Sequence, residues 1–414
     1  MEVLSLGNSR WRPERQFRKG GSITRGNLDA ILNGDLTLVE LKVPPQGIQS
    51  KQSSTKYNVR ATFCEVDWSL QQQNPSAVPM FRDLRGASRN CKSTETMMDF
   101  WDVVQAAKRY DAASSSSSSS EKASSIVQPI PPTGVVFHET RCGSTLFANL
   151  MAAFSPQQSR VYSESPPPVA AIKACDDDHK NSSCNPELHS RLIQDTFYMM
   201  GRRRRTASRV ETTPQSVFYK IQSIGSMHID KFAQAMPDVP WVFLYRDTVE
   251  IMQSHLSKSS GGALSHRAVC ARNYDNVLYQ PKTTKQVITN AGRQLKDLSL
   301  TQYCAAHLAG LSLSAVQEHE RTGRGRFVNY KQMPDVVWND IFPNYFKIPI
   351  TAAEIGRMEA ASQLYSKGRG AKSNQEWKDD VKAKQDAASP AVIQAADVFT
   401  KDVFHRMEEL SKRR

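Results

Sequence analysis

The sequence predicts an α/β fold in which helices flank a central parallel sheet. From Ile126 onwards, short apolar runs alternate with longer segments whose apolar residues recur at helical spacing. Strands separated by helices pair in parallel, because each helix carries the chain back across the sheet. The chain has 414 residues, 39% of them hydrophobic, which is enough to bury one large domain of this kind with extensions.

The elements of this domain follow from the hydrophobic pattern. Strands are predicted near 135–138, 160–162, 217–221, 241–245 and 326–328, and helices near 144–154, 188–200, 229–236, 249–256 and 291–320. The charged segment from Ala352 to the C-terminus is predicted to be helical. Segments 175–187 and 202–205 fall between these elements and are predicted to be exposed loops.

The chain is divided by a low-complexity stretch. Residues 1–111 are interpreted as a mostly helical or irregular N-terminal extension, 112–127 as a serine-rich flexible linker, and 128–414 as the α/β domain. The linker cannot bury enough apolar surface to order itself. Within the extension, 36–41 alternates like a strand, and 94–110 has the pattern of an amphipathic helix.

Charge and cysteine content indicate an anionic partner and a reducing compartment. The formal net charge of +13 favours anions, whether a nucleotide, a nucleic acid or a membrane surface. The 7 scattered cysteines form no evident disulfide framework. The N-terminus lacks the apolar core of a signal peptide, and no membrane span is expected. We therefore expect a cytoplasmic protein, or one of the Golgi lumen if an anchor precedes this sequence.

The most informative stretch is 135–146, where an apolar run ends in a polar turn. The turn reads Arg141-Cys142-Gly143-Ser144-Thr145, and the periodicity of a helix begins at Leu146. Backbone N–H groups at such a strand–turn–helix junction bind anions. The lysine of a Walker A loop is missing, so the turn is poorly suited to hold β- and γ-phosphates with magnesium. Taken alone, the stretch fits an anion-binding loop and an ordinary structural turn equally well.

A second motif favours the anion-binding interpretation. The predicted strand 241–245 is followed by Arg246, and open α/β sheets bind ligands at the carboxyl ends of their strands. Ser254 comes eight residues later, about two helical turns along the following segment. Either residue alone fits a structural role, an ion pair for Arg246 and a helix-face hydroxyl for Ser254. Together they have the spacing to hold a second phosphate.

The two motifs together resemble those of the P-loop sulfotransferases, which use 3′-phosphoadenosine-5′-phosphosulfate as sulfate donor. The family's 5′-phosphosulfate loop is matched by Arg141 to Thr145, with Leu146 after it, and its 3′-phosphate motif by Arg246 and Ser254. Thr248 stands where the family usually has proline. A later Lys-Gly loop of the family, which also contacts the 3′-phosphate, corresponds to Lys367-Gly368. The resemblance covers about residues 130–370 and implies a P-loop-type sheet.

The resemblance also implies catalytic roles. Many cytosolic members carry Lys-x-His on a central strand, whereas this chain has Lys220 and, in place of the histidine, Gln222. Lys220 and Arg141 would then stabilise the charge of the departing phosphate, unless Lys220 is a strand-end lysine that reaches solvent. Glu164, after the second strand, resembles the glutamate base of some bacterial sugar sulfotransferases. Alternatively, Glu164 caps a loop or pairs with an arginine. His138 is the reserve base, or a strand-end histidine with its own partners.

Other signals define the rival interpretations. Cys175, His179, Cys184 and His189 are zinc-ligand types without a finger spacing, so no metal is expected. A nucleotide-dependent kinase would need a magnesium site, for which Asp247 is the one hint. A non-catalytic nucleic-acid-binding protein is suggested by the net charge and by the run 202–205. We expect a sulfotransferase with a nucleotide donor and a hydroxyl-bearing acceptor, a carbohydrate or small molecule, and without a nucleic-acid partner.

Overall fold

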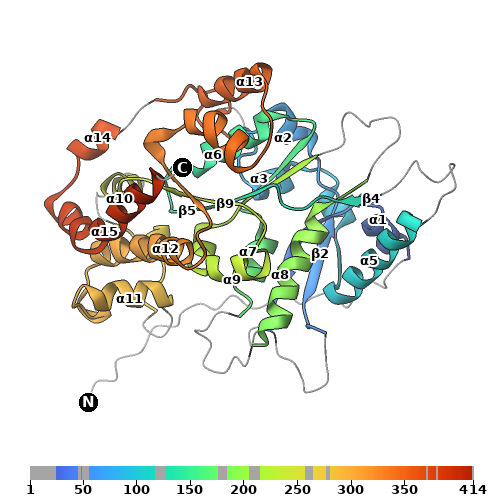
Figure 1. The fold of residues 1–414 in the computed structure, drawn as a ribbon, viewed down its shortest axis with the longest axis horizontal. Helices are drawn as coiled ribbons and strands as arrows, with labels where there is room; N and C mark the ends of the chain where they lie inside the picture. The colour runs from blue at the N-terminus through green and yellow to red at the C-terminus, as the bar shows by residue number, and fades with distance from the viewer. Residues whose placement is uncertain are drawn as a thin grey trace, which may run out of the picture.

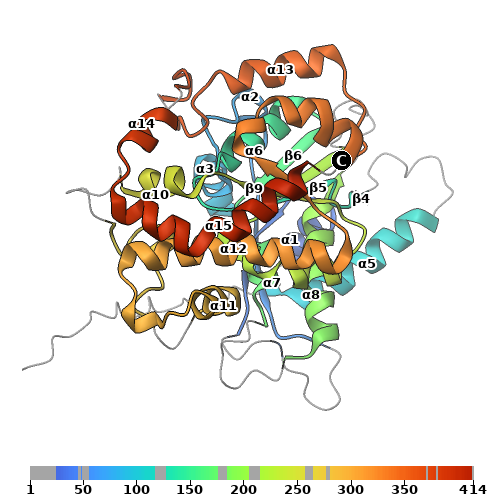
Figure 2. The same ribbon diagram turned by 60° about the vertical axis from the view of Figure 1, so that its left-hand side comes forward.

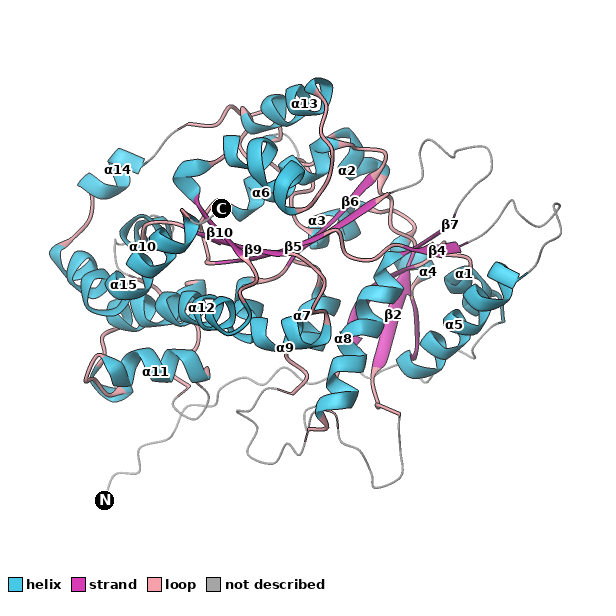
Figure 3. Ribbon diagram, viewed as in Figure 1, coloured by secondary structure: helices cyan, strands magenta, loops and turns pink. Residues whose placement is uncertain are grey.

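A parallel sheet with the strand order β10-β9-β5-β8-β6 forms the centre of the fold (Figure 3). Its strands are β5 (Gly134–His138), β6 (Ser159–Ser163), β8 (Ser216–Lys220), β9 (Trp241–Tyr245) and β10 (Arg326–Asn329). Each lies at a position predicted from the sequence. All the side chains of β5 and β9 are buried, as expected for inner strands of a parallel sheet covered on both faces. The predicted fold class is confirmed.

The computed structural model describes residues 25–44, 48, 56–116, 127–175, 184–204, 215–256, 264–276, 280–369, 372–378 and 381–412. On one face of the sheet lie α6 (Ser144–Phe154) and α13 (Ala352–Ser362), which pack on each other (Figure 1). The other face is covered by α7 (Pro166–Ile172), α9 (Ile229–Ala235) and α12 (Leu300–Thr322). The long C-terminal α15 (Pro390–Ser411) packs along α12 and against β10, as a second view shows (Figure 2).

The remaining helices and strands complete these layers. They are α1 (Arg25–Leu32), β1 (Thr37–Lys42), β2 (Arg60–Cys64), α2 (Ser69–Gln73), α3 (Phe81–Ala87), α4 (Cys91–Thr94), β3 (Thr96–Asp99), α5 (Phe100–Ser116), β4 (Val127–Pro129), α8 (Pro186–Gly201), β7 (Arg202–Arg204), α10 (Thr248–Leu256), α11 (Lys282–Asn290) and α14 (Val381–Asp386). The 3₁₀ helices are η3 (Ser223–His228), η4 (Val269–Ala271), η5 (Leu295–Asp297) and η6 (Tyr330–Gln332), and η7 (Val337–Tyr345) is a π-helix.

The N-terminal part packs directly onto the main sheet. Strands β1, β2 and β3 form an antiparallel sheet next to α7 and α8, and residues on both sides of 117–126 share one apolar core. The side chain of Gln71 closes the free edge of β6. Its Nε2 donates to the carbonyl of Val161 over 2.9 Å, and its Oε1 accepts from the Val161 amide over 3.1 Å. Of the predicted linker, 112–116 belong to α5 and 117–126 lie outside the described residues.

Two predicted helices differ from the structure. The segment 94–110 begins with strand β3, because its backbone pairs with β2, and the helix starts only at Phe100. The segment 291–320 was predicted to be one helix, but α11 ends before Gly292, whose φ is +64°. Glycine in this left-handed conformation is a common helix stop. A capping box between Ser299 and Gln302 then starts α12.

The predicted exposed loop at 202–205 is also wrong where it is described. Arg202 and Arg203 are 2% and 3% exposed. The Arg202 guanidinium donates to both carboxylate oxygens of Asp111, and Arg203 donates to the hydroxyl of Tyr162 over 2.8 Å. These two arginines hold the small β4–β7 sheet on the core, so they are not free to contact a nucleic acid.

The expected absence of disulfides is wrong as well. The pairs Cys64–Cys91, Cys175–Cys184 and Cys270–Cys304 are bonded, with Cα atoms 4.7, 5.6 and 4.7 Å apart, the ordinary range for a disulfide. Cys142 is left as the free cysteine. Sequence spacing could not show this, because each pair is brought together by the fold. Among the helices that the structure describes, none is long and apolar enough to cross a membrane.

Candidate active site

The loop 141–145 joins β5 to α6 at the carboxyl edge of the sheet. Two of its residues have the left-handed backbone that such a tight turn needs, Arg141 with a φ of +60° and Gly143 with a φ of +84°. A non-glycine residue at positive φ costs free energy and is concentrated at functional sites. Gly143 caps α6, so the N–H groups of the first turn, from Ser144 and Thr145 to Leu146, have no partner within the helix.

Features of the loop fit an anionic ligand. The hydroxyl of Thr145 is buried without a hydrogen-bond partner among the described residues. A Cβ at Gly143 would lie 2.4 Å from the ring of Tyr330, so only glycine fits between this ring and the helix. The positive end of α6 favours a phosphate or sulfate in front of it. Cys142 is buried, and its thiol donates to the carbonyl of Glu139 over 3.0 Å, which makes it a structural residue of the loop.

Arg246 lies at the end of β9, the strand next to β5. Its guanidinium lies over the ring of Tyr330, 4.2 Å from the centroid, and its Nε pairs with Glu250 Oε2 at 2.5 Å. Tyr330 therefore contacts both predicted phosphate-binding segments, since it packs on Gly143 and on Arg246. Ser254 is 2% exposed on α10, and its hydroxyl donates to the carbonyl of Glu250 over 2.9 Å.

Glu139 joins these two segments, although no sequence motif marks it as a candidate. Its carboxyl accepts from the Arg246 amide over 3.0 Å and contacts the Ser312 hydroxyl at 2.6 Å. Burial raises its pKa to about 8, so the carboxyl is mainly protonated at neutral pH. A neutral carboxyl can donate to Ser312, whose hydroxyl is also 3.3 Å from the carbonyl of Leu308. Glu139 therefore ties β5, β9 and α12 together.

The predicted catalytic residues Glu164 and Lys220 are in direct contact. Lys220 Nζ lies 2.7 Å from Glu164 Oε1 at the adjacent ends of β8 and β6. The Lys220 side chain is fully buried and the Glu164 side chain is 25% exposed. Burial by itself would raise the pKa of Glu164, but the charge and hydrogen bond of Lys220 outweigh it and lower this pKa to about 2. Glu164 is thus a carboxylate at every physiological pH.

Gln222 has a role that its sequence position did not show. Glu164 has a φ of +56°, and its amide donates to the carbonyl of Lys220 over 2.7 Å. The Gln222 side chain donates to the Glu164 carbonyl over 3.2 Å. Gln222 therefore helps to hold the strained backbone of Glu164.

The third predicted binding segment, Lys367-Gly368, lies at the same edge of the sheet. It is fixed to α6 by Asn149, whose amide donates to the carbonyl of Ser366 over 3.0 Å. The charge of Lys367 contributes to the lowered pKa values of both His138 and Glu164, so this charge lies near the Glu164–Lys220 pair. A Cβ at Gly368 would lie 2.3 Å from the carbonyl oxygen of Lys372, so the turn requires glycine.

The structure therefore places the loop 141–145, His138, Glu164, Lys220 and Arg246 at the carboxyl ends of neighbouring strands of one sheet. Asp247, the hint of a magnesium site, instead accepts from the Glu250 amide over 3.1 Å and caps α10. No group of three potential metal ligands occurs among the described residues. For the zinc interpretation, His179 lies outside these residues, while His189 Nε2 contacts the carbonyls of Ala171 and Ile172 at 2.9 and 3.1 Å.

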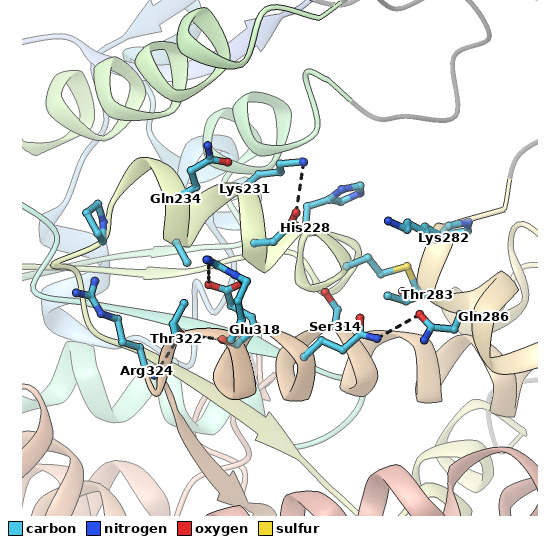
Figure 4. Close-up of a pocket in the computed structure, with 17 residues that line it drawn as sticks. His228, Lys231, Gln234, Lys282, Thr283, Gln286, Ser314, Glu318, Thr322 and Arg324 are labelled. Carbon is cyan, nitrogen blue, oxygen red and sulfur yellow. Dashed lines mark hydrogen bonds and ion pairs between the residues drawn. The ribbon is translucent and has the colours of Figure 1, made fainter. Parts of the chain in front are cut away.

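A separate groove, with a volume of about 820 Å³, lies between α9, α11 and α12 (Figure 4). Its lining is polar and carries both charges, with Glu318 paired to Arg321 at 2.7 Å. Lys231, Gln234, Lys282, Gln286 and Arg324 lie around it (Figure 4). None of the described residues that line it was selected from the sequence, so this groove and the loop 141–145 are different places on the molecule.

Comparisons with solved structures show distant similarity. No protein-family model matches the sequence, and no curated protein matches it. Among solved structures, the sulfotransferase STF9 from Mycobacterium avium aligns with a TM-score of 0.35 and 13% sequence identity. The alignment covers 72% of this chain and 81% of the STF9 chain. A similarity this distant does not assign the activity of STF9 to this chain.

Proposed function

We propose that this protein is a sulfotransferase that moves a sulfuryl group from 3′-phosphoadenosine-5′-phosphosulfate to a hydroxyl acceptor. The observation that carries the proposal is that two anion-binding segments, the loop 141–145 and Arg246, lie on adjacent strands with one aromatic ring, Tyr330, against both. A nucleotide with phosphates at both ends of its ribose would bridge such a pair. The second support is the buried Glu164–Lys220 ion pair at the same edge.

Each residue has a role set by its position. The first-turn N–H groups of α6, the Thr145 hydroxyl and Arg141 would hold the 5′-phosphosulfate. Arg246, Ser254 and Lys367 would hold the 3′-phosphate. At the 3′-phosphate site the ligand would take over a contact that the protein now makes internally, that of Arg246 with Glu250. These cationic and N–H groups stabilise anions without a metal ion.

The chemical step would exchange the partner of Lys220. As the sulfur–oxygen bond to the donor breaks, its electron pair goes to the departing phosphate oxygen, and Lys220 would stabilise that charge. When Lys220 turns from Glu164 to this oxygen, the cause of the low pKa of Glu164 is weakened. Glu164 then becomes a stronger base at the moment when the acceptor hydroxyl must lose its proton.

Calorimetry with 3′-phosphoadenosine-5′-phosphate tests the donor site without knowledge of the acceptor. We expect this bisphosphate to bind, and Arg246→Ala to weaken it at least about 10-fold, the loss of one charge-assisted phosphate contact. Arg406→Ala is the matched control, because Arg406 pairs with Glu320 and Glu409 on the surface of α15. Tighter binding of ATP with magnesium would support a kinase instead. Binding of a short oligonucleotide alone would support the nucleic-acid interpretation.

The compartment is part of the proposal. Three disulfides persist in an oxidising environment and are rare in the cytosol. We therefore propose that the protein acts in the lumen of the secretory pathway, in place of the cytoplasm expected from the cysteine count.

A further inference from the structure

His138, at the end of β5, is oriented so that one ring nitrogen faces Glu164. The residue is 3% exposed, and its Nδ1 lies 2.6 Å from the carbonyl oxygen of Glu139. A carbonyl only accepts hydrogen bonds, so the proton of the neutral ring is on Nδ1. Nε2 therefore carries a lone pair. It is buried without a hydrogen-bond partner among the described residues, and it lies 3.9 Å from Glu164 Oε1.

Two acceptors that face each other without a proton between them gain nothing from their contact. A carboxylate oxygen and an unprotonated imidazole nitrogen both offer lone pairs. Once a single proton enters the pair, they can share it, either as a carboxylic acid that donates to Nε2 or as an imidazolium beside a carboxylate. A rotation of the Glu164 side chain, which is 25% exposed, would shorten the 3.9 Å separation to hydrogen-bond length. The geometry thus describes a site that receives one proton.

We propose that His138 is a proton-relay residue that acts through Glu164 in sulfuryl transfer. This inference rests on the proposed function. The acceptor hydroxyl gives its proton to Glu164 while its oxygen forms the new bond to sulfur, and the bond from sulfur to the donor phosphate breaks. Glu164 passes the proton to His138 Nε2, which leaves a carboxylate beside an imidazolium. The proton returns to solvent through Glu164 after the sulfated product leaves.

The surrounding charges favour this destination for the proton. Burial, and after it the charge of Lys220, lowers the pKa of His138 to about 4, whereas for Glu164 the charge of Lys220 outweighs burial and lowers the pKa to about 2. Lys367 contributes in the same direction to both. The two groups next to the pair, Glu139 and Cys142, have raised pKa values of about 8 and about 12, and so add little charge at neutral pH. Once Lys220 has returned to Glu164, His138 is therefore the more basic of the two partners and takes the proton.

The coupling can be measured without an acceptor. In ¹⁵N-histidine-labelled protein, His138 is assigned by its loss in His138→Asn. We expect its neutral form to carry the proton on Nδ1. We also expect Glu164→Gln to lower its pKa by about one unit, because the imidazolium loses an anionic neighbour. A proton on Nε2, or a pKa that does not respond to Glu164→Gln, would overturn the relay. This measurement uses the native histidine, so it does not depend on how a His138 variant folds.

An activity assay tests the catalytic role of His138. It measures hydrolysis of 3′-phosphoadenosine-5′-phosphosulfate, in which water is the acceptor. The asparagine of His138→Asn can keep the donor to the Glu139 carbonyl, while the glutamine of His138→Gln can place an amide oxygen near the site of Nε2. Neither amide can take up a proton. We expect both variants to lower kcat by about 10- to 100-fold. Binding of 3′-phosphoadenosine-5′-phosphate should stay within about 2-fold of wild type, because the contacts of the His138 side chain are with the Glu139 carbonyl and with Glu164.

The outcomes separate the inference from the proposed function. Full activity in either variant would contradict the relay, and rescue by glutamine alone would indicate a hydrogen-bonding role in its place. Failure of the wild-type protein to bind 3′-phosphoadenosine-5′-phosphate would reject the proposed function itself, whatever the histidine titration shows.

Discussion

The backbone amide of Arg246 donates to the buried carboxyl of Glu139 over 3.0 Å, which joins the ends of β9 and β5. These strand ends carry the two predicted phosphate-binding segments. This carboxyl makes the free energy of unfolding depend on pH. Its pKa is about 8 in the folded protein, whereas its ordinary value, which applies in the unfolded chain, is 4.5.

The first prediction concerns stability against pH. His138 and His307 have folded pKa values of about 4, below the ordinary 6.5, so the stability they contribute is complete above pH 6.5 and is lost as pH falls toward 4. Glu139 acts in the opposite sense, and its contribution is lost as pH rises from 4.5 to 8. The unfolding free energy should therefore be largest near pH 6.5 and fall by about 2 kcal/mol by pH 8.

Urea unfolding across this pH range measures the effect. Glu139→Gln keeps a donor for Ser312 and an acceptor for the Arg246 amide but does not titrate, so it should remove the fall above pH 6.5. A fall of the same size in Glu139→Gln and wild type would show that another group is responsible.

The second prediction concerns Gly143. Gly143→Ala adds a Cβ that would lie 2.4 Å from Tyr330, at a φ of +84°. We expect it to destabilise the protein by about 1–3 kcal/mol through strain and to weaken 3′-phosphoadenosine-5′-phosphate binding more than about 10-fold, because the loop must shift. Gly292→Ala is the matched control, since Gly292 also has a positive φ, +64°, but no atom within 4 Å of the added Cβ. It should cost stability without loss of binding.

Substitution of Glu164 should affect catalysis but not donor binding. Glu164→Gln should lower kcat for donor hydrolysis by about 100-fold or more, while the affinity for the bisphosphate changes less than about 2-fold. Gln222→Leu removes the donor to the Glu164 carbonyl. It should give a smaller loss of kcat, about 10-fold, because the base is misplaced but present. Equal activity of Glu164→Gln and wild type would exclude Glu164 as the base.

The fourth prediction concerns the disulfides. Alkylation of the denatured, unreduced protein should modify only Cys142, and alkylation after reduction should modify all 7 cysteines. The Cys270–Cys304 bond joins α12 to the segment before α11 across a sequence separation of 34. Its replacement by Cys270→Ala and Cys304→Ala should lower the unfolding free energy by about 3–4 kcal/mol. Three or more accessible thiols before reduction would contradict the pairing.

Much of the fold could be predicted because its signals are local. The strand at 241–245 and the helix at 144–154 match the sequence prediction, since continuous apolar runs and helical periodicity survive in a covered sheet. The β3 strand could not be read in the same way. Its residues Thr96–Asp99 continue the pattern of a helix, and only pairing with β2 makes them a strand.

The site residues also differ in whether a local sequence signal marks them. Arg141 and Arg246 could be selected because each follows an apolar strand at a fixed position in a motif. Tyr330 and Glu139 could not, because their importance comes from neighbours that are distant in sequence. Tyr330 is 84 positions after Arg246 and contacts it through the adjacent strands β9 and β10. For the arginines of β7 the local signal was misleading. A run of charged residues is exposed in most proteins, but here the arginines are buried and contact Asp111 and aromatic rings.

The carboxamide of Gln71 reproduces on β6 the paired hydrogen bonds that a neighbouring strand would make at Val161. A sheet edge left open offers its backbone to any other extended chain, and this is a common start of aggregation. The N-terminal part therefore protects the central sheet against self-association through this edge. A shortened form beginning after residue 126 would expose that edge, and its poor solubility could be mistaken for a failure to fold.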